Sequence, residues 1–352
     1  MTFPVMDARQ RLLNDWQHGF PLCARPYAQL AQATGLTEAE VMRTLRQTLA
    51  DGRVSRIGGV FAPGAGGAAT LAAMTVPEGR IEAVAARVST HPGVNHNYLR
   101  EHRLNLWFVM TGADQDAVES GVAALEADCG QLALRLPLLR AYYIDLGFDL
   151  RGGHETGAAA RHPARARAAV TEPIPASQCT LARLAEAGLA IIERPYAAWA
   201  DELGWGEEQV LACLQGWLDA GQLKRFGVVV RHHELGLAAN AMVVFDVPDA
   251  VADARGQALA GQPGVTLAYR RARAAGWPYS LYAMVHGARR DAVQAVIERA
   301  TGAAGLAPCP REILFSTRRF KQTGARRFRG WNVDGQIASV TPQRETSDAL
   351  AG

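Results

Sequence analysis

Arg25-Pro26-Tyr27-Ala28 returns later in the chain as Arg194-Pro195-Tyr196-Ala197, at a spacing of 194 less 25, or 169 positions. The same spacing relates Arg56-Ile57-Gly58 to Arg225-Phe226-Gly227. Self-similarity at a fixed period is the sequence signature of a duplicated structural unit. The repeat therefore predicts that the chain folds as two copies of one module.

The correspondence continues into the residues that follow these motifs. Its members are His91-Pro92-Gly93-Val94 with Gln262-Pro263-Gly264-Val265, Tyr98 with Tyr269, and Arg100 with Arg271. The duplication therefore extends well beyond a single short motif.

Composition indicates an ordinary soluble globular protein. The chain has 352 residues, of which 49% are hydrophobic and 20% charged, and this length predicts two or more domains. No apolar run approaches the roughly 18 residues that span a bilayer, and residues 1–19 lack the basic flank and apolar core of a signal peptide. We therefore expect a cytoplasmic protein with no membrane partner. Its five cysteines contain no Cys-x-x-Cys pair, which argues against a zinc site, a cluster or a disulfide framework.

The first part of each copy is predicted to contain three short helices and a strand. Pro26 suits the first position of a helix, and Thr37 followed by Glu40 forms a capping box. The elements are expected at Asp7–Gln17, Pro26–Gly35, the helix between Thr37 and Gly52, and Arg53–Phe61, and again at Leu181–Gly188, Pro195–Leu203, Glu207–Leu218 and Gln222–Val230. This order predicts a winged helix-turn-helix.

After each helical unit the pattern runs strand, helix, strand, strand, helix, strand, which is the ferredoxin-like split βαβ order. In copy one the elements are expected at Leu71–Val76, Arg80–Ser89, Val94–Arg100, Asn105–Thr111, Asp114–Ala127 and Leu132–Leu146. In copy two the strands are expected to begin near Ala241, Val265, Tyr279 and Leu306. The predicted fold class is α+β, with two tandem copies of a winged helix-turn-helix followed by a ferredoxin-like domain.

Six segments follow from this pattern. They are a first winged helix at 1–62, a first ferredoxin-like domain at 63–150, a linker at 151–177, a second winged helix at 178–232, a second ferredoxin-like domain at 233–329 and a polar tail at 330–352. The linker is rich in Ala, Arg, Gly and Pro without apolar periodicity, which is typical of a flexible segment.

A winged helix joined to a ferredoxin-like domain resembles the Lrp/AsnC family of transcription regulators, which bind amino acids and DNA. The resemblance implies that the two ferredoxin-like halves pair as an internal pseudo-dimer, with a pocket between the sheet faces and the helical units. Further homodimerisation is left open.

DNA recognition requires Arg, Lys, Asn or Gln near the start of the recognition helix. Here the third helix opens with Glu38 and Glu40 in copy one and with Glu207 and Glu208 in copy two, and carboxylates repel phosphate. The net charge of +3 is also small. Nucleic acid is therefore not the expected partner, and a regulator that responds to a small ligand stays the alternative.

The segment from His96 to Phe108 contains an unusual density of polar side chains. Strand alternation predicts His96, Tyr98 and Arg100 on one face of a sheet, and Asn95, Asn97 and Leu99 on the other, with a turn at Glu101–Leu104. Such a face can line a pocket. The simpler interpretation makes His96 a half-buried histidine, His102 and Arg103 a solvated turn, and Trp107 part of the core.

Several motifs resemble those of the siroheme decarboxylases of the heme d1 and alternative heme pathways. They are Asn-Tyr-x-Arg-x-His-x-x-Asn-x-Trp-Phe at Asn97–Phe108, Arg-His-His-Glu-Leu-Gly-x-x-Ala-Asn-Ala-Met-Val-Val at Arg231–Val244, Tyr143–Phe148 and Arg318–Lys321. Those enzymes use two Lrp-like subunits, and this chain is similar to the form in which both are fused. The resemblance implies a carboxy-lyase that removes carbon dioxide from two acetate side chains of siroheme and yields didecarboxysiroheme.

The resemblance also implies roles for particular residues. Siroheme carries eight carboxylates, which arginine forks bind well. The residues expected to bind substrate are Arg56, Arg100, Arg103, Asn105, Trp107, Arg225, Tyr269, Arg270, Arg271 and Arg273. Loss of carbon dioxide leaves a carbon that must be protonated, so a general acid is needed, and His96 and His102 are the candidates. Tyr98, or Tyr269 in copy two, would position the acetate or relay a proton.

Copy two lacks these histidines, because Ala268–Tyr279 keeps Tyr and Arg but contains no His. Either copy one alone is catalytic, or copy two uses Tyr269 or a histidine from elsewhere, His232 and His233 being the nearest in the motif. If the iron has a protein ligand, His96, His102, His232 and His233 compete for that position.

No pyridoxal lysine or thiamine-binding motif is evident, so we expect no cofactor beyond the iron tetrapyrrole substrate, whose macrocycle can accept the electron pair. Two further segments stand out in the sequence. Pro63–Gly67 is expected to be a hinge, because it lacks the Lys-Ser/Thr of a P-loop. Arg318–Arg329 either closes over an anionic ligand or forms a solvated basic tail.

Overall fold

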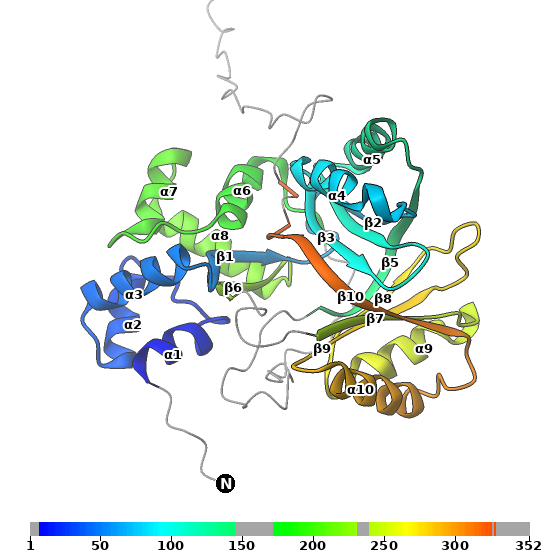
Figure 1. Cartoon of the computed structure of the whole chain (residues 1–352). Coiled ribbons are helices and arrows are strands. Elements are labelled where there is room, and N and C mark those ends of the chain that lie inside the picture. Colours follow the sequence, from blue (N-terminus) through cyan, green and yellow to red (C-terminus); the bar gives the residue numbers. More distant parts are fainter. Residues whose placement is uncertain (1–6, 145–171, 231–238, 326, 329–352) are drawn as a thin grey trace, which may run out of the picture.

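The computed structural model describes residues 7–144, 172–230, 239–325 and 327–328, and it has the predicted α+β architecture (Figure 1). The helical unit of copy one consists of α1 (Ala8–Asn14), α2 (Pro26–Thr34), α3 (Glu38–Ala50) and β1 (Val54–Phe61). That of copy two consists of η2 (Ala176–Gln178), α6 (Cys179–Ala187), α7 (Pro195–Leu203), α8 (Glu207–Asp219) and β6 (Leu223–Val230). The predicted helix-turn-helix units are therefore confirmed.

Local sequence explains where these helices begin and end. Pro26 occupies the first turn of α2, and Gly35 ends that helix with a left-handed φ of 74°. Thr37 accepts a hydrogen bond from the Glu40 N–H, and the Glu40 side chain accepts one from the Thr37 N–H, so the expected capping box is present. These signals are local, which is why the sequence alone predicted them.

The strand of each helical unit does not form a wing within its own unit. Instead β1 and β6 pair with each other, antiparallel, with Gly58 opposite Gly227. A Cβ on Gly58 would lie 2.6 Å from the Ala185 carbonyl oxygen, so only glycine allows the helical unit of copy two to approach this closely. The two units consequently share one hydrophobic core rather than forming two separate ones.

The ferredoxin-like halves form a closed eight-stranded barrel in the order β10-β3-β4-β2-β5-β8-β9-β7. The strands of copy one are β2 (Ala68–Met74), β3 (Val94–Arg100), β4 (Leu106–Gly112) and β5 (Ala133–Ile144). Those of copy two are β7 (Ala239–Phe245), β8 (Val265–Arg271), β9 (Leu281–Gly287) and β10 (Arg311–Gln322). The long strands close the barrel, because β5 pairs with β8 and β10 pairs with β3 across the two copies. The predicted internal pairing of the halves is therefore present.

Four helices cover the outside of the barrel (Figure 1). They are α4 (Ile81–Thr90), preceded by the short helix η1 (Glu78–Arg80), α5 (Gln115–Cys129), α9 (Asp249–Ala260) and α10 (Arg290–Ala303). Each sheet buries one apolar face against its two helices, and these faces form two separate cores. A fourth core contains residues of both copies, among them Trp107, Tyr282 and Trp277, and fills part of the barrel interior.

The largest differences from the expected boundaries concern the last strand and the linker. The last strand begins at Arg311 rather than near Leu306, because Pro308 and Pro310 have no N–H to donate to a sheet. The end of the predicted linker is also ordered in part: Ile174 is buried, and its N–H donates to the Ala65 carbonyl oxygen at 2.7 Å.

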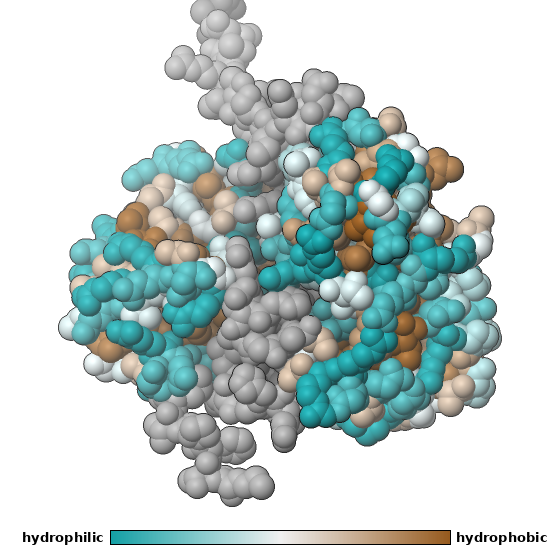
Figure 2. Space-filling model, viewed as in Figure 1, coloured by the Kyte–Doolittle hydropathy of each residue, from teal (hydrophilic) through white to brown (hydrophobic). Residues whose placement is uncertain are grey.

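The surface is mainly hydrophilic in the view of Figure 2, with hydrophobic side chains in small groups. The large apolar residues that are exposed come from separate parts of the chain and are Leu132, Leu139, Ile192 and Val251. Within the described ranges, no helix has the length and apolar character needed to cross a membrane.

Candidate active site

A cavity of about 330 Å³ lies between the β1–β6 sheet and the strands of the barrel, and this volume is within the usual range for small-molecule sites. Both copies contribute to its walls, so the cavity requires the internal pairing described above. The lining residues with functional side chains are Arg56, Asn95, His96, Tyr98, Arg100, Trp107, Glu186, Arg225, Asn240, Tyr269, Arg271, His286 and Arg327.

Equivalent Tyr-Arg pairs from β3 and β8 occupy two sides of the cavity. The Arg100 guanidinium lies 5.5 Å from the centre of the Tyr98 ring, and that of Arg271 lies 4.6 Å from the Tyr269 ring. The Nε atoms of both arginines are buried and make no hydrogen bond within the protein. Burial lowers the pKa of Arg100 to about 10, so it remains a cation at neutral pH. Each guanidinium therefore has a donor that no group of the protein satisfies.

A second pair of arginines approaches the cavity from the β1–β6 sheet. Arg56 donates to the Gly59 carbonyl oxygen at 3.0 Å, and Arg225 donates to the Gln17 carbonyl oxygen at 2.9 Å. Both are buried and line the cavity. The two arginine pairs, each related by the internal repeat, thus surround one cavity.

His96 lines the cavity beside Tyr98, and the two rings stack with centroids 6.2 Å apart. Its Nδ1 lies 2.6 Å from Asn95 Oδ1. Burial, together with the nearby Arg100 cation, lowers the pKa of His96 to about 4. The neutral imidazole is therefore the favoured form when no ligand is bound.

Asn95 also lines the cavity, although alternation placed it on the opposite face. The pairing of β3 with β4 shifts register between Val94 and His96. Such an irregularity breaks the two-residue alternation of a strand. Asn97 keeps the predicted orientation, because its Nδ2 donates to the Ala85 carbonyl oxygen on α4 at 3.0 Å.

The structure places three residues of the β3–β4 region outside the lining. The His102 ring packs edge-on against Trp277 at 5.4 Å, and Arg103 donates to the Gly276 carbonyl oxygen at 3.0 Å. Asn105 Oδ1 accepts from the Val76 N–H at 2.9 Å. These three side chains therefore contact neighbouring connections between strands. Trp107 of the same segment does line the cavity.

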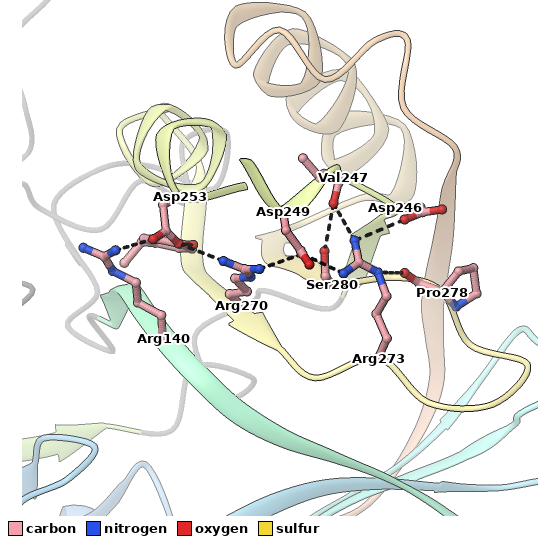
Figure 3. A network of polar contacts seen from close by, with 10 residues as sticks. Arg140, Asp246, Val247, Asp249, Asp253, Arg270, Arg273, Pro278 and Ser280 are labelled. Carbon is pink, nitrogen blue, oxygen red and sulfur yellow. Dashed lines mark hydrogen bonds and ion pairs between the residues drawn. The ribbon is translucent and has the colours of Figure 1, made fainter. Parts of the chain in front are cut away.

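Arg270 and Arg273 also lie outside the lining, in a network of ion pairs at the junction of β5 with β8 (Figure 3). Arg270 contacts Asp249 at 2.6 Å, and Arg273 contacts the same carboxylate at 2.7 Å. Asp253 continues the network to Arg140 of copy one at 2.5 Å. Arg270 follows Tyr269 on the strand and so points to the other face, where it pairs with Asp249 and Asp253 of its own copy.

His232 and His233 lie outside the described residues. Another histidine, His286 on β9, lines the cavity and was not anticipated from the sequence. Its Nδ1 lies 2.8 Å from Thr266 Oγ1, and it is opposite Asn240, whose Oδ1 is buried without a hydrogen-bond partner. Copy two therefore contributes its own histidine to the site.

An alignment of strands β4 and β9 would have revealed this residue. Leu106–Gly112 and Leu281–Gly287 have equal length, and His286 occupies the position of Thr111. His286 lies on β9, which corresponds to β4, whereas His96 lies on β3, which corresponds to β8. Comparison of the β3 and β8 regions alone therefore missed His286.

The arrangement suits a flat ring that carries several carboxylates. Aromatic side chains supply apolar walls, and buried arginines supply cations around them. Among the described residues there is no group of three or more His, Cys, Asp or Glu that could hold a metal ion. A metal centre built by the protein alone is therefore not evident in this part of the chain.

Comparisons with known proteins agree with this geometry. Residues 9–54 and 179–223 match the "Siroheme decarboxylase NirDL-like HTH domain", and residues 65–142 and 234–321 match the "AsnC-like ligand binding domain". The chain is 41% identical to the siroheme decarboxylase NirDL subunit of Paracoccus denitrificans, over 92% of this chain and 98% of that protein.

Two further comparisons cover a part of the chain and nearly all of it, respectively. The siroheme decarboxylase NirD subunit of Stutzerimonas stutzeri is 53% identical over 40% of this chain and 93% of its own length. A crystal structure of the siroheme decarboxylase NirDL in complex with an iron-uroporphyrin III analogue superposes with a TM-score of 0.62 and 26% identity, covering 91% of this chain and 93% of that one.

Proposed function

The chain belongs to the siroheme decarboxylase family, in its fused NirDL form, and we propose that the cavity between the β1–β6 sheet and the barrel is where siroheme loses two acetate carboxyl groups. The product is didecarboxysiroheme, and the enzyme is a carboxy-lyase. The observation that carries the assignment of the site is the set of four arginines that line one aromatic-walled cavity from equivalent positions of both copies; Arg56, Arg100 and Arg225 are buried and Arg271 is half-buried.

The arginines would bind carboxylates that are not removed in the reaction. Arg100 and Arg271 each have a buried Nε–H with no partner in the protein, which a substrate carboxylate would satisfy. Arg56 and Arg225 would contact the substrate from the opposite wall. Tyr98 and Tyr269 stack beside two of these arginines and would position the reacting acetates.

The chemistry needs no external electron donor or acceptor. The bond between the methylene carbon and the carboxyl carbon breaks, carbon dioxide leaves, and the electron pair remains on the methylene carbon, conjugated with the macrocycle. A proton then converts that carbon to a methyl group, so charge and atoms balance. We propose that the macrocycle itself stabilises the electron pair, without a cofactor beyond the iron tetrapyrrole.

His96 is our candidate for the proton donor in copy one, and His286 for that in copy two. Burial keeps His96 neutral in the free protein, because its pKa is about 4. A bound polycarboxylate would bring negative charge close to this ring and raise that pKa, which favours the protonated form when substrate is present. Asn95 would then fix the ring orientation through Nδ1.

The same residues are candidates for an iron ligand. His96 and His286 face the cavity, and His232 and His233 keep that candidacy from the sequence alone. His102 is less suited to either role, because it packs against Trp277 outside the lining. No second copy of the chain is required by this proposal, since one chain supplies both halves of the cavity.

The alternative of a transcription regulator gains no support from the helical units. Glu38 at the start of α3 pairs with Arg25, and Glu207 at the start of α8 pairs with Arg194. Arg46, further along α3, donates to the Ile191 carbonyl oxygen at 2.6 Å. Arg25, Arg194 and Arg46 are thus held by groups of the protein itself.

Anaerobic incubation with siroheme, followed by mass spectrometry, tests the proposed function. We expect the mass to fall by two carbon dioxide units, through a singly decarboxylated species. Unchanged siroheme after prolonged incubation with a protein that binds it would refute the enzymatic proposal. A gel-shift against duplex DNA at low salt checks the regulator, which saturable binding would support.

A further inference from the structure

The described residues that directly follow β10 lie against the cavity. Thr323, Gly324, Ala325 and Arg327 all line the cavity, and we call residues 323–325 and 327–328 the β10 extension. The Thr323 N–H donates to the Asn95 carbonyl oxygen at 2.8 Å, which connects this segment to the neighbour of His96. Arg318, by contrast, forms a surface ion pair with Glu82. Only part of the basic cluster therefore approaches the site.

Arg327 is the cation that the β10 extension brings to the cavity. Its Nη1 donates to the Ala62 carbonyl oxygen at 3.2 Å, beside the end of β1. Burial lowers its pKa from the ordinary value, and the nearby Glu186 carboxylate partly opposes that shift. Arg327 remains positively charged at neutral pH, because an arginine pKa begins far above 7.

Glu186 on α6 holds the backbone of this segment. Its Oε1 accepts the Arg327 N–H at 2.8 Å, and its Oε2 accepts the Phe328 N–H at 3.2 Å. The carboxylate is only 3% exposed and lines the same cavity. A negative charge at this place repels a polycarboxylate ligand, so electrostatics alone would disfavour Glu186 in a siroheme site. The hydrogen bonds that Glu186 accepts from the β10 extension explain why a carboxylate is nevertheless present at this position.

The extension is also closely fitted to its surroundings. The Phe328 ring packs edge-on against Phe61 at 4.8 Å. Gly66 lies directly beneath Phe328, where a Cβ would overlap the ring, and Gly67 lies under the Arg327 backbone, where a Cβ would lie 2.6 Å from its carbonyl oxygen. The backbone of Arg327 is therefore positioned by packing as well as by Glu186.

The carboxylate of Glu186 has no counterpart in copy one. The residue equivalent to Glu186 in copy one is Gln17, since 186 less 169 is 17. Gln17 uses its backbone carbonyl to accept from Arg225. Copy one thus fills this position with a neutral amide, which shows that the fold itself does not require a charge there.

We propose that Arg327 is a further substrate-binding residue, which contacts a carboxylate of the tetrapyrrole, and that Glu186 is the positioning residue that holds it over the cavity. This inference rests on the proposed function, because it takes the cavity to be the tetrapyrrole site. The inference gives different roles to two members of the basic cluster Arg318–Arg329. Arg327 faces the ligand, whereas Arg318 lies at the surface.

Titration of the full chain with iron-uroporphyrin III, followed by absorbance, tests Arg327. We expect Arg327→Gln to raise the dissociation constant roughly tenfold to a hundredfold, the usual effect of losing a charged hydrogen bond. Arg318→Gln removes a cation of the same cluster and is the matched control, which should change affinity little. Equal effects of the two substitutions would overturn the proposal, because they would indicate general electrostatic attraction.

Glu186→Gln distinguishes positioning from simple repulsion by the sign of its effect. The amide accepts one N–H through its oxygen but cannot accept the second, so the placement of Arg327 weakens. We expect affinity for iron-uroporphyrin III to fall about threefold to tenfold. Tighter binding in this variant would overturn the positioning role, since removal of a negative charge alone favours an anionic ligand.

Turnover separates this inference from the proposed function. If the unsubstituted chain decarboxylates siroheme while Arg327→Gln binds normally, the inference fails and the function stands. If the unsubstituted chain binds iron-uroporphyrin III but leaves siroheme intact, weaker binding by Arg327→Gln still supports the inference. Should Arg327→Gln fail to fold by circular dichroism, Arg327→Lys decides. Its ammonium keeps the charge but lacks the planar guanidinium fork, so we expect weaker binding; unchanged affinity together with an unchanged KM would overturn a direct contact of the Arg327 guanidinium with a carboxylate.

Discussion

Arg100 and Arg271 are related by the internal repeat, and each donates a hydrogen bond to a backbone carbonyl of the other copy. Arg100 Nη1 lies 2.9 Å from the Leu314 oxygen, and Arg271 Nη1 lies 2.7 Å from the Leu136 oxygen. Leu314 is on β10 and Leu136 is on β5, the two strands that close the barrel. The pairing of the copies therefore determines where both guanidinium groups lie in the cavity.

This reciprocity predicts that the two arginines are comparably important for binding. Arg100→Gln and Arg271→Gln each remove a cation that lines the proposed substrate cavity, and we expect each to weaken iron-uroporphyrin III binding by about 1.5–3 kcal/mol. Isothermal titration calorimetry measures both effects. Arg289→Gln is a suitable control, because Arg289 is an exposed residue that pairs with the neighbouring Asp291. A large loss in one variant with none in the other would show that the two halves bind unequally.

The proton donors are tested by substitution of the histidines in the cavity. We expect His96→Ala and His286→Ala to retain tetrapyrrole binding but to lower kcat by about a hundredfold or more, the usual contribution of a general acid. If each histidine serves one acetate, each variant accumulates a singly decarboxylated product, which mass spectrometry detects.

His102→Ala is the informative comparison for this experiment. His102 lies against Trp277 outside the cavity lining, so its loss should leave turnover near that of the unsubstituted chain. A turnover defect confined to His102→Ala, with His96→Ala fully active, would contradict the assignment.

Local signals in the sequence predicted most of the fold. Pro26, Gly35 and the Thr37–Glu40 capping box define helix ends through contacts between residues close in sequence. The repeat then assigned the same elements to copy two. Pairing across the copies had no such signal: the antiparallel contact of β1 with β6 was expected to be two separate wings, because each strand finds its partner far along the chain.

The candidate site was predicted only in part, for the same reason. Tyr98, Arg100, Tyr269 and Arg271 were expected together because the repeat aligns them, and they do line one cavity. Arg270 and Arg273 were grouped with them by proximity in sequence, yet strand alternation and the turn direct them to Asp249. His286 and Glu186 come from distant elements, which only the closed barrel and its contact with α6 bring to the cavity.

His91 predicts how stability changes with pH. Its Nδ1 accepts the Gly93 N–H, and burial, aided by the Lys321 and Arg87 cations and opposed by Asp128, lowers its pKa to about 4. The unfolded chain, with a histidine pKa near 6.5, binds more protons between these values. Stability contributed by neutral His91 is therefore present above about pH 6.5 and is lost as pH falls towards 4.

Urea unfolding at pH 7 and pH 5 measures this contribution. His91→Asn keeps an acceptor for the Gly93 N–H but cannot be protonated, so the loss of stability on acidification should be smaller than in the unsubstituted chain by about 1 kcal/mol or more. An identical loss in both proteins would show that other groups cause the pH dependence.

The strand pairs between the two copies predict that the linker is dispensable for assembly. Chains covering residues 1–150 and 172–352, produced together, should associate, because β1–β6, β5–β8 and β10–β3 all join the copies and the Arg140–Asp253 ion pair supports one seam. The match of the separate NirD subunit to 40% of this chain agrees with that expectation. Co-purification through a tag on one fragment, followed by siroheme turnover, measures this association.

Gly227→Val should prevent assembly of the two fragments, because its Cβ would lie 2.6 Å from the Gln17 carbonyl oxygen. Fragments that fold separately but do not associate would show that the covalent connection, rather than these strand pairs, holds the cavity together.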